Sequence, residues 1–265
     1  MRPSAIYRPD LLQGKTVIVT GGGSGIGKAI AAECAALGAK VAIGARKPER
    51  LFETADALRA EGAQVFAAPL DIRDADAVEA WVARVWEELG PVDVLVNNAG
   101  GQFPSEALGI SPKGWRAVID TNLNGTWLMS QAVGKRMVAR GQGRVINIVA
   151  NMWRGFPGMA HTGAARAGVV NLTKTLALEW AKAGVLVNAV APGVIRSSGL
   201  DNYAPEVREM LETTVPEQIP LRRLGTELDV AWAVVYLAAP SGDYVTGETI
   251  CVDGGQAHWG NVFPV

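Results

Sequence analysis

The residues best suited to chemistry open a long amphipathic segment, and they are His161, Thr162 and Arg166. This segment runs to about Lys182 and follows a short apolar stretch, residues 144–149. A strand, a loop and a helix that begins with polar side chains commonly bring reactive groups to one edge of a sheet. Thr162 and Arg166 are four residues apart, so they share one face of a helix. The pattern therefore predicts an active-site helix.

A second candidate site is the glycine-rich segment 20–27, between a predicted strand and a predicted helix. Glycines permit positive φ and close backbone approach, and a helix N-terminus presents free N–H groups to a diphosphate. The spacing is T-G-x-x-x-G-x-G rather than the dinucleotide pattern G-x-G-x-x-G. We predict that the dinucleotide-binding residues of this segment are Gly21, Ser24, Gly25, Ile26 and Gly27.

The end of the second predicted strand indicates which cofactor is used. An NAD site carries an acidic side chain about 20 residues after the glycines, because a carboxylate accepts hydrogen bonds from the ribose 2′-hydroxyl. This chain has Arg46 and Lys47 there instead. The planar fork of Arg46 suits a 2′-phosphate, so the sequence favours NADP(H). The alternative is that both side chains are simply solvated.

The elements that must position these residues alternate regularly along the chain. Short β-branched runs predict strands, and segments with apolar residues at helical spacing predict helices. This alternation predicts one α/β domain over 1–265, a doubly wound Rossmann-type fold with a seven-stranded parallel sheet and helices on both faces. The predicted strands are 15–20, 40–45, 64–68, 93–97, 144–149, 185–190 and 248–252, and the predicted helices are 26–37, 48–60, 75–89, 111–140, 162–182 and 226–238.

Two parts of the chain fall outside this alternation. Residues 193–225 are too long for an ordinary connection, which favours a mobile flap or substrate loop, with a plain surface excursion as the alternative. The aromatic tail, residues 256–265, is expected to dock on a neighbouring chain.

Composition narrows the class of protein. The chain has 265 residues, of which 49% are hydrophobic, and a formal net charge of -1, so it offers no basic surface for nucleic acid. No apolar run approaches the roughly 20 residues of a membrane span, and the N-terminus has no signal-peptide core. We therefore expect a cytoplasmic protein. Cys34 and Cys251 show no metal-binding or redox spacing and are expected to be buried thiols.

Over essentially its full length the chain resembles the short-chain dehydrogenase/reductase family. The motifs that carry the resemblance are 20–27, 70–72, Asn97-Asn-Ala-Gly100, 121–123, Pro192-Gly193 and Asp253-Gly254-Gly255. The resemblance implies that Asp71 and Ile72 flank the adenine of the cofactor. It also implies that the remaining cofactor contacts come from Asn98, Ala99, Gly100, Pro192, Gly193, Ile195 and Ser197.

The family's catalytic set is Asn, Ser, Tyr and Lys, in which a neighbouring ammonium lowers the pKa of the phenol. Asn122 matches the first member. The other three positions fall on Ala150, Thr162 and Arg166. Threonine is a poor proton donor, and arginine does not lose its proton in a protein. Arg166 can still hydrogen-bond the nicotinamide ribose, so cofactor binding is expected to survive better than alcohol oxidation.

This pattern of loss has a precedent. Segments 161–169, 100–103 and 109–115 resemble peroxisomal trans-2-enoyl-CoA reductase and, more loosely, the 2,4-dienoyl-CoA reductases. The resemblance implies reduction of a carbon–carbon double bond conjugated to a thioester. Such chemistry needs an oxyanion donor and an acid, but no phenol to deprotonate an alcohol.

The source of the proton stays open in the sequence. Val170 and residues 151–153 stand where the related enzymes have tyrosines. Tyr203 lies in the predicted flap and is the tyrosine placed to reach the cleft. His161 is the other candidate, since histidine exchanges protons near neutral pH, although a histidine at a helix start is as often a cap or a packed side chain.

Three further arginines and one glutamine bear on substrate binding. Gln102 can donate to a thioester oxygen, and Arg196, Arg222 and Arg223 can meet the phosphates of coenzyme A. A solvated surface is the simpler interpretation of Arg222 and Arg223.

Three functions follow in order of preference. The first is an NADPH-dependent reductase of enoyl thioesters. The second is a carbonyl or alcohol oxidoreductase acting on an apolar, for example terpenoid, substrate. The third is a catalytically weak NADP-binding protein.

The chain is also expected to associate. Val169, Leu172, Leu176 and Trp180 form an apolar helical face that either contacts another subunit or fills the core. The family resemblance implies a homotetramer built on this helix and the last strand.

Overall fold

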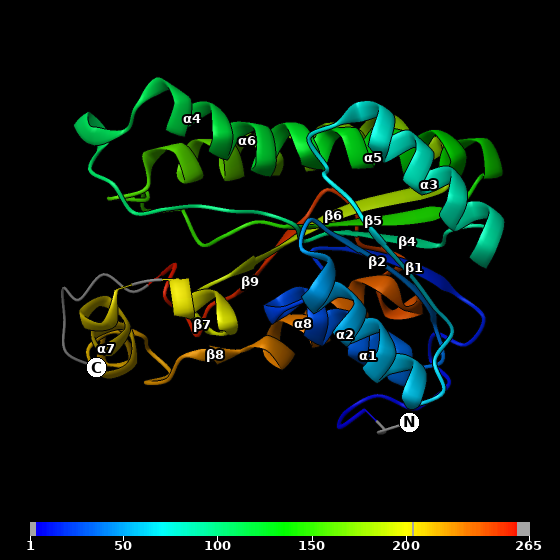
Figure 1. The fold of residues 1–265 in the computed structure, drawn as a ribbon, viewed down its shortest axis with the longest axis horizontal. Helices are drawn as coiled ribbons and strands as arrows, with labels where there is room; N and C mark the ends of the chain where they lie inside the picture. The colour runs from blue at the N-terminus through cyan, green and yellow to red at the C-terminus, as the bar shows by residue number, and fades with distance from the viewer. Residues whose placement is uncertain (1–3, 203, 259–265) are drawn as a thin grey trace.

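The computed structural model describes residues 4–202 and 204–258. Its centre is a sheet of seven parallel strands in the order β3-β2-β1-β4-β5-β6-β9 (Figure 1). The order reverses between β1 and β4, the point at which doubly wound sheets bind their ligands. The strands are β1 (Thr16–Thr20), β2 (Lys40–Ala45), β3 (Val65–Pro69), β4 (Val94–Asn97), β5 (Gly143–Ile148), β6 (Val185–Pro192) and β9 (Thr249–Val252). The predicted fold class is confirmed.

Helices cover both faces of this sheet. Figure 1 shows α1 (Gly25–Ala36), α2 (Pro48–Ala60) and α8 (Glu227–Ala238) on one face. On the other face lie α3 (Ala75–Leu89), α4 (Pro112–Ile119), α5 (Gly125–Arg140) and α6 (Ala160–Trp180). Each layer encloses its own apolar core. Both faces of β1 and β4 are therefore buried, which explains why these strands consist almost wholly of apolar and β-branched residues.

The predicted helical region 111–140 is continuous but not uniform. A π-helical turn, Asp120–Asn124, joins α4 to α5, and Asn122 within it is fully buried. Such π turns are rare and often occur at functional sites. Ser111 caps the start of α4 by accepting a hydrogen bond from the backbone of Gly114.

The segment 193–225 is built from short elements rather than irregular chain. Strand β7 (Ile195–Arg196) pairs with β8 (Gly225–Thr226), and α7 (Pro205–Thr213) lies between them. Short 3₁₀ helices, Ser198–Asn202 and Val215–Gln218, flank α7. None of the described residues of α7 is buried, so few packing contacts hold it. That the segment moves over a substrate stays a prediction.

The apolar face of α6 packs into the chain's own core. Val169 and Leu176 are buried, and Leu172 and Trp180 pack partly buried against core clusters. A Cβ added at Gly134 would lie 2.4 Å from the Trp180 ring, which shows how closely α5 and α6 approach. The core alternative thus accounts for this face, and a homotetramer stays a prediction of the family resemblance. The tail from residue 259 onward lies outside the described residues.

The two cysteines differ. Cys34 is fully buried, and burial raises the pKa of its thiol to about 12. Cys251 is exposed, so the expectation of a buried thiol is wrong there. The reason is that β9 is the edge strand of the sheet, where one side of the chain has no neighbouring strand.

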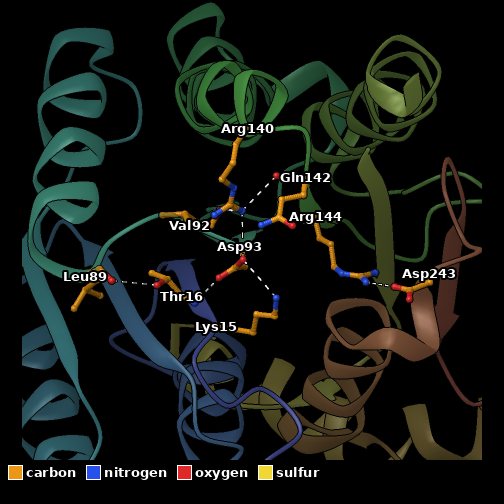
Figure 2. A network of polar contacts seen from close by, with 9 residues as sticks. All are labelled: Lys15, Thr16, Leu89, Val92, Asp93, Arg140, Gln142, Arg144 and Asp243. Atoms are coloured by element: carbon orange, nitrogen blue, oxygen red, sulfur yellow. Dashed lines mark hydrogen bonds and ion pairs between the residues drawn. The ribbon is translucent and has the colours of Figure 1, made fainter. Parts of the chain in front are cut away.

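A polar network centred on Asp93 holds the amino ends of β1, β4 and β5 together (Figure 2). The carboxylate accepts a hydrogen bond of 2.9 Å from the Thr16 backbone and lies 3.3 Å from Nη2 of Arg140. Arg144 forms an ion pair with Asp243, which follows the 3₁₀ turn Pro240–Gly242 after α8. This edge is thus fastened by charge-assisted hydrogen bonds, and the carboxyl ends of the strands are left for the functional site. No helix in the described part of the chain has the length and apolarity to cross a membrane.

Candidate active site

The glycine-rich loop closes tightly over the start of α1. Gly21 has a φ of +71°, which favours glycine. A Cβ added at Gly27 would lie 2.4 Å from both the Gly21 carbonyl oxygen and Nδ2 of Asn98, so only glycine fits there. Ser24 is the N-cap residue, yet its side chain makes no capping bond, and the first turn holds no acidic residue. The first N–H groups of α1 therefore stay available to an anion such as a diphosphate.

The loop after β4 is fastened to the end of β1. The Thr20 hydroxyl accepts hydrogen bonds of 3.0 Å from the backbone N–H groups of Asn98 and Ala99. Nδ2 of Asn98 donates to the Thr20 carbonyl at 2.9 Å. These contacts bring the predicted cofactor residues of the two loops side by side at the switch point of the sheet. Their contact with a cofactor stays a prediction.

The predicted adenine end is rich in charge. Arg46 and Lys47 follow β2 and are exposed. Asp71 accepts hydrogen bonds from Nε of Arg73 at 2.9 Å and from its Nη2 at 2.5 Å. These bonds, and to a smaller degree the charges of Arg73 and Arg46, lower the pKa of Asp71 to about 2. Ile72 is buried beside this carboxylate. An ionised Asp71 thus pairs with Arg73 and lies within electrostatic range of Arg46, the residue proposed to meet a 2′-phosphate.

Arg166 lies buried on α6 beneath the loop after β4. Its Nη1 donates to the Ile148 carbonyl at 2.8 Å, and its Nε is buried without a hydrogen-bond partner among the described residues. Burial lowers the pKa of the guanidinium to about 10. A Cβ added at Gly100 would lie 2.4 Å from Nη2 of Arg166, so the glycine leaves this positive group space. A buried cation with an unused donor fits a polar ligand such as a cofactor ribose.

Asn122 serves mainly to hold that loop. Its Nδ2 donates to the carbonyls of Gly101 at 2.7 Å and Val118 at 2.8 Å, and its Oδ1 accepts from the Gly101 N–H at 3.3 Å. Its backbone carbonyl accepts a hydrogen bond from the Thr126 hydroxyl at 3.0 Å. The predicted catalytic role of Asn122 is untested, and its contacts show a positioning role.

His161 and Thr162 are both fully buried. Nδ1 of His161 accepts a 2.8 Å hydrogen bond from the Thr162 backbone N–H, which also points to the Met159 carbonyl. The Thr162 hydroxyl lies 3.3 Å from the same ring nitrogen. Phe103 packs edge-on against the imidazole, with ring centroids 4.6 Å apart. Nε2 of His161 is buried without a partner among the described residues. The histidine is thus a packed side chain within the first turn of α6, whose N-cap residue is Met159, and its Nε2 is left unused.

The segment after β6 approaches the glycine-rich loop. A Cβ added at Gly25 would lie 3.9 Å from Cβ of Ser197 and 3.5 Å from Oγ of Ser198. Ile195 is buried, and Pro192 accepts a hydrogen bond from the Asn151 N–H at 2.9 Å. A Cβ at Gly193 would lie only 2.8 Å from Cα of Asp253, so two predicted family motifs pack together.

The arginines predicted near a coenzyme A phosphate are placed differently from one another. Arg223 forms an ion pair of 2.9 Å with Asp229, and Nη1 of Arg222 donates to the Glu217 carbonyl at 2.5 Å. Both therefore fasten their own segment to its neighbours. Arg196 is exposed and lines a surface depression with Ser197 and α7. Gln102 is exposed in the loop after β4, and Tyr203 lies outside the described residues.

Two residues near the site were missed by sequence reasoning. Phe103 is an ordinary apolar loop residue in the sequence, and its contact with His161 depends on long-range packing. Glu227 follows the Thr226 N-cap of α8, and its Oε1 would lie 3.8 Å from a Cβ at Gly25. Burial raises the pKa of Glu227. The predicted helix 226–238 located the start of α8 to within one residue, but local sequence could not show its position beside α1.

Comparison with known proteins agrees with this architecture. A family model described as enoyl-(acyl carrier protein) reductase matches residues 21–257. A probable 2,4-dienoyl-CoA reductase of Bacillus subtilis is 38% identical over 96% of this chain and 100% of its own length. The 3-oxoacyl-[acyl-carrier-protein] reductase FabG of Staphylococcus aureus is 39% identical over 91% of this chain and 98% of its own.

Among solved structures, the citronellol catabolism dehydrogenase AtuB of Pseudomonas aeruginosa matches with a TM-score of 0.85 and 44% identity, covering 96% of this chain and 99% of that one. The chain therefore belongs to the short-chain dehydrogenase/reductase family of oxidoreductases. Members of this family bind NAD(P)(H). The glycine cradle and the buried, partly unpartnered Arg166 fit such a cofactor.

Replacing Arg166 with Met tests whether the guanidinium serves cofactor binding or the stability of the fold. Methionine removes a buried charge that no carboxylate pairs with in the described structure, at the loss of the bond to Ile148. We expect the free energy of unfolding to stay within about 1 kcal/mol of the parent value, because these effects oppose each other. The affinity for NADPH or NADH should fall at least about tenfold, since the predicted charge-assisted contact to the ribose would be lost. Urea denaturation and NADPH fluorescence titration measure the two quantities.

The matched control is Arg84→Met, because the Arg84 side chain is 57% exposed on α3. This variant should keep both stability and NADPH affinity. An Arg166→Met protein that unfolds far more easily yet binds NADPH like the parent would show that the guanidinium is structural.

Proposed function

We propose that this protein is an NADPH-dependent reductase of the carbon–carbon double bond of enoyl thioesters, with acyl-CoA as the substrate class. The observation that carries the proposal is the replacement of the proton-transferring pair at the start of α6. Thr162 stands in the place of the phenol, and the buried Arg166 in the place of the amine. No group there accepts the proton of an alcohol, whereas positive charge is retained. The similarity to a probable 2,4-dienoyl-CoA reductase supports the same chemistry.

When bound, the nicotinamide cofactor supplies a hydride to the β-carbon of the substrate. The electron pair of the double bond then moves toward the thioester carbonyl, whose oxygen gains negative charge, and the α-carbon takes a proton from water. Arg166 holds its guanidinium beside Gly100 and Asn122, where it orients the cofactor ribose and adds positive potential. Thr20 and Asn98 hold the loop after β4 against the end of β1, beside the glycine-rich loop. Hydrogen-bond donors fixed before the reaction stabilise developing charge without reorganisation.

The preference for NADP(H) over NAD(H) rests on the end of β2. Arg46 is exposed there, close enough to Asp71 to lower the pKa of that carboxyl, and Lys47 follows it. A guanidinium at this place attracts a 2′-phosphate, and an acidic side chain that would bind a free ribose hydroxyl is missing from it.

Replacing Arg46 with Asp tests this preference. We expect NADPH affinity to fall at least about tenfold because the carboxylate repels the 2′-phosphate, while NADH affinity stays equal or rises. Fluorescence titration with both cofactors measures the change. Lys174→Asp, an exposed charge reversal on α6, is the control and should leave both affinities unchanged. If Arg46→Asp binds NADPH like the parent, the cofactor assignment is wrong.

A second candidate function is reduction of a ketone or oxidation of an alcohol. The identity of 44% to a citronellol catabolism dehydrogenase and of 39% to a 3-oxoacyl-[acyl-carrier-protein] reductase favours it. Against it stands Ala150, which lacks the hydroxyl that the family's serine position provides, together with Thr162.

A substrate panel distinguishes these functions. We expect NADPH consumption with crotonyl-CoA and longer enoyl-CoA esters at a kcat/KM at least about tenfold above that with acetoacetyl-CoA, citronellal or free enones, because the site retains oxyanion stabilisation but lacks the phenol. Activity confined to ketones, aldehydes or alcohols would overturn the proposal. Tight NADPH binding with no turnover of any substrate would favour a binding protein.

A further inference from the structure

The imidazole of His161 has a determined arrangement of donor and acceptor. Nδ1 accepts the hydrogen bond from the Thr162 backbone N–H at 2.8 Å, so this nitrogen carries no hydrogen. In a neutral imidazole the other nitrogen then carries it. The hydrogen-bond network thus assigns the Nε2–H form to His161.

This Nε2–H is an unused donor inside the protein. The side chain is fully buried, and Nε2 has no partner among the described residues. Buried polar groups are nearly always hydrogen-bonded, and exceptions are often tied to function. Arg166, five residues further along α6, also has a buried nitrogen without a described partner, so two unused donors lie near the start of one helix.

The neighbours of the His161 ring place it on the side of the site where the substrate is expected to bind. The Thr162 hydroxyl, at the family's tyrosine position, lies 3.3 Å from Nδ1. The ring also packs edge-on against Phe103, which is 39% exposed and lies two residues after Gly101, the glycine that Asn122 holds. Phe103 therefore separates the imidazole from the surface of the protein. The part of the loop after β4 that carries Phe103, residues 98–106, contains no helix or strand.

We propose that His161 is a catalytic hydrogen-bond donor, whose Nε2–H binds the substrate carbonyl oxygen that gains negative charge, with Phe103 turning aside when the substrate enters. The oxygen is that of a thioester if the proposed function holds. Neutral imidazole is suited to this role, because a fixed donor in a dry site stabilises an oxyanion strongly.

The same geometry makes His161 a poor source of the proton. Full transfer of the Nε2 hydrogen would leave an imidazolate anion in a buried site. Protonation of Nδ1 would place an N–H against the Thr162 N–H and break the hydrogen bond that orients the ring. His161 thus stabilises charge rather than supplying the proton for the α-carbon.

Two substitutions test the role of the donor. His161→Phe keeps an aromatic ring against Phe103 but removes the N–H, whereas His161→Gln keeps an N–H donor. With crotonyl-CoA we expect the kcat of His161→Phe to fall about 10²–10³-fold, and that of His161→Gln to stay within about tenfold of the parent. NADPH affinity should change less than about threefold in both. If His161→Phe turns over like the parent, the proposal is wrong.

A spectroscopic measurement gives a readout that does not depend on turnover. The chain has 2 histidines, His161 and His258, so ¹⁵N ring resonances are assigned by comparison with His161→Gln. We expect the pattern of a neutral ring protonated at Nε2, and a downfield shift of that proton when butyryl-CoA is added to the protein loaded with NADP⁺. A hydrogen on Nδ1, or no shift at saturating butyryl-CoA, would overturn the proposal.

The outcomes separate this proposal from the proposed function on which it rests. If the parent enzyme reduces acetoacetyl-CoA but no enoyl-CoA, the proposed function is wrong, and the same two variants assayed with acetoacetyl-CoA decide the role of His161. If the parent reduces neither, the ring spectrum and the butyryl-CoA shift decide it.

Discussion

A buried guanidinium that pairs with no carboxylate of residues 4–202 and 204–258 is the constraint on which the rest of the site depends. Arg166 satisfies one donor with the Ile148 carbonyl and leaves another unused. Burying such a charge costs free energy, so the surrounding residues must hold it in place. Gly100 makes space for it, and Asn122 holds the Gly100–Gly101 loop over it. A polar cofactor that accepted the remaining hydrogen bond of Arg166 would offset this cost. Because the guanidinium is already in place, the cofactor would bind with little reorganisation.

The proposed chemistry follows from the side chains that Ala150 and Thr162 replace. Thr162 and Ala150 provide no group that accepts the proton of an alcohol, so the site is better suited to stabilising charge on a carbonyl oxygen. In the proposed mechanism His161 contributes a hydrogen-bond donor at Nε2, and Arg166 contributes positive potential. Relatives at 38% and 39% identity are named for reduction of a dienoyl thioester and of a 3-oxoacyl thioester, respectively. The shared fold therefore does not determine which of these reactions a member catalyses. The side chains of the site determine it.

Local signals in the sequence predicted most of the framework. The bounds of β2, α2 and α3 match residues 40–45, 48–60 and 75–89, because β-branched runs, Pro48 and the Asp74 N-cap mark their ends locally. The chain alone could not show the π turn at Asn122, the contact of Phe103 with His161 or the exposure of Cys251. The contact of Phe103 with His161 and the exposure of Cys251 depend on packing between residues far apart in the sequence. The π turn likewise holds Asn122 against Gly101, which lies 21 residues earlier.

The fate of the transferred hydride tests the central claim most directly. Crotonyl-CoA is incubated with the enzyme and with NADPH that carries deuterium at the transferable position, and the product is examined by NMR and mass spectrometry. The account predicts butyryl-CoA with one deuterium on the β-carbon and, in ordinary water, a protium on the α-carbon. Unchanged crotonyl-CoA, together with acetoacetyl-CoA converted to a product with deuterium on its carbinol carbon, would contradict it.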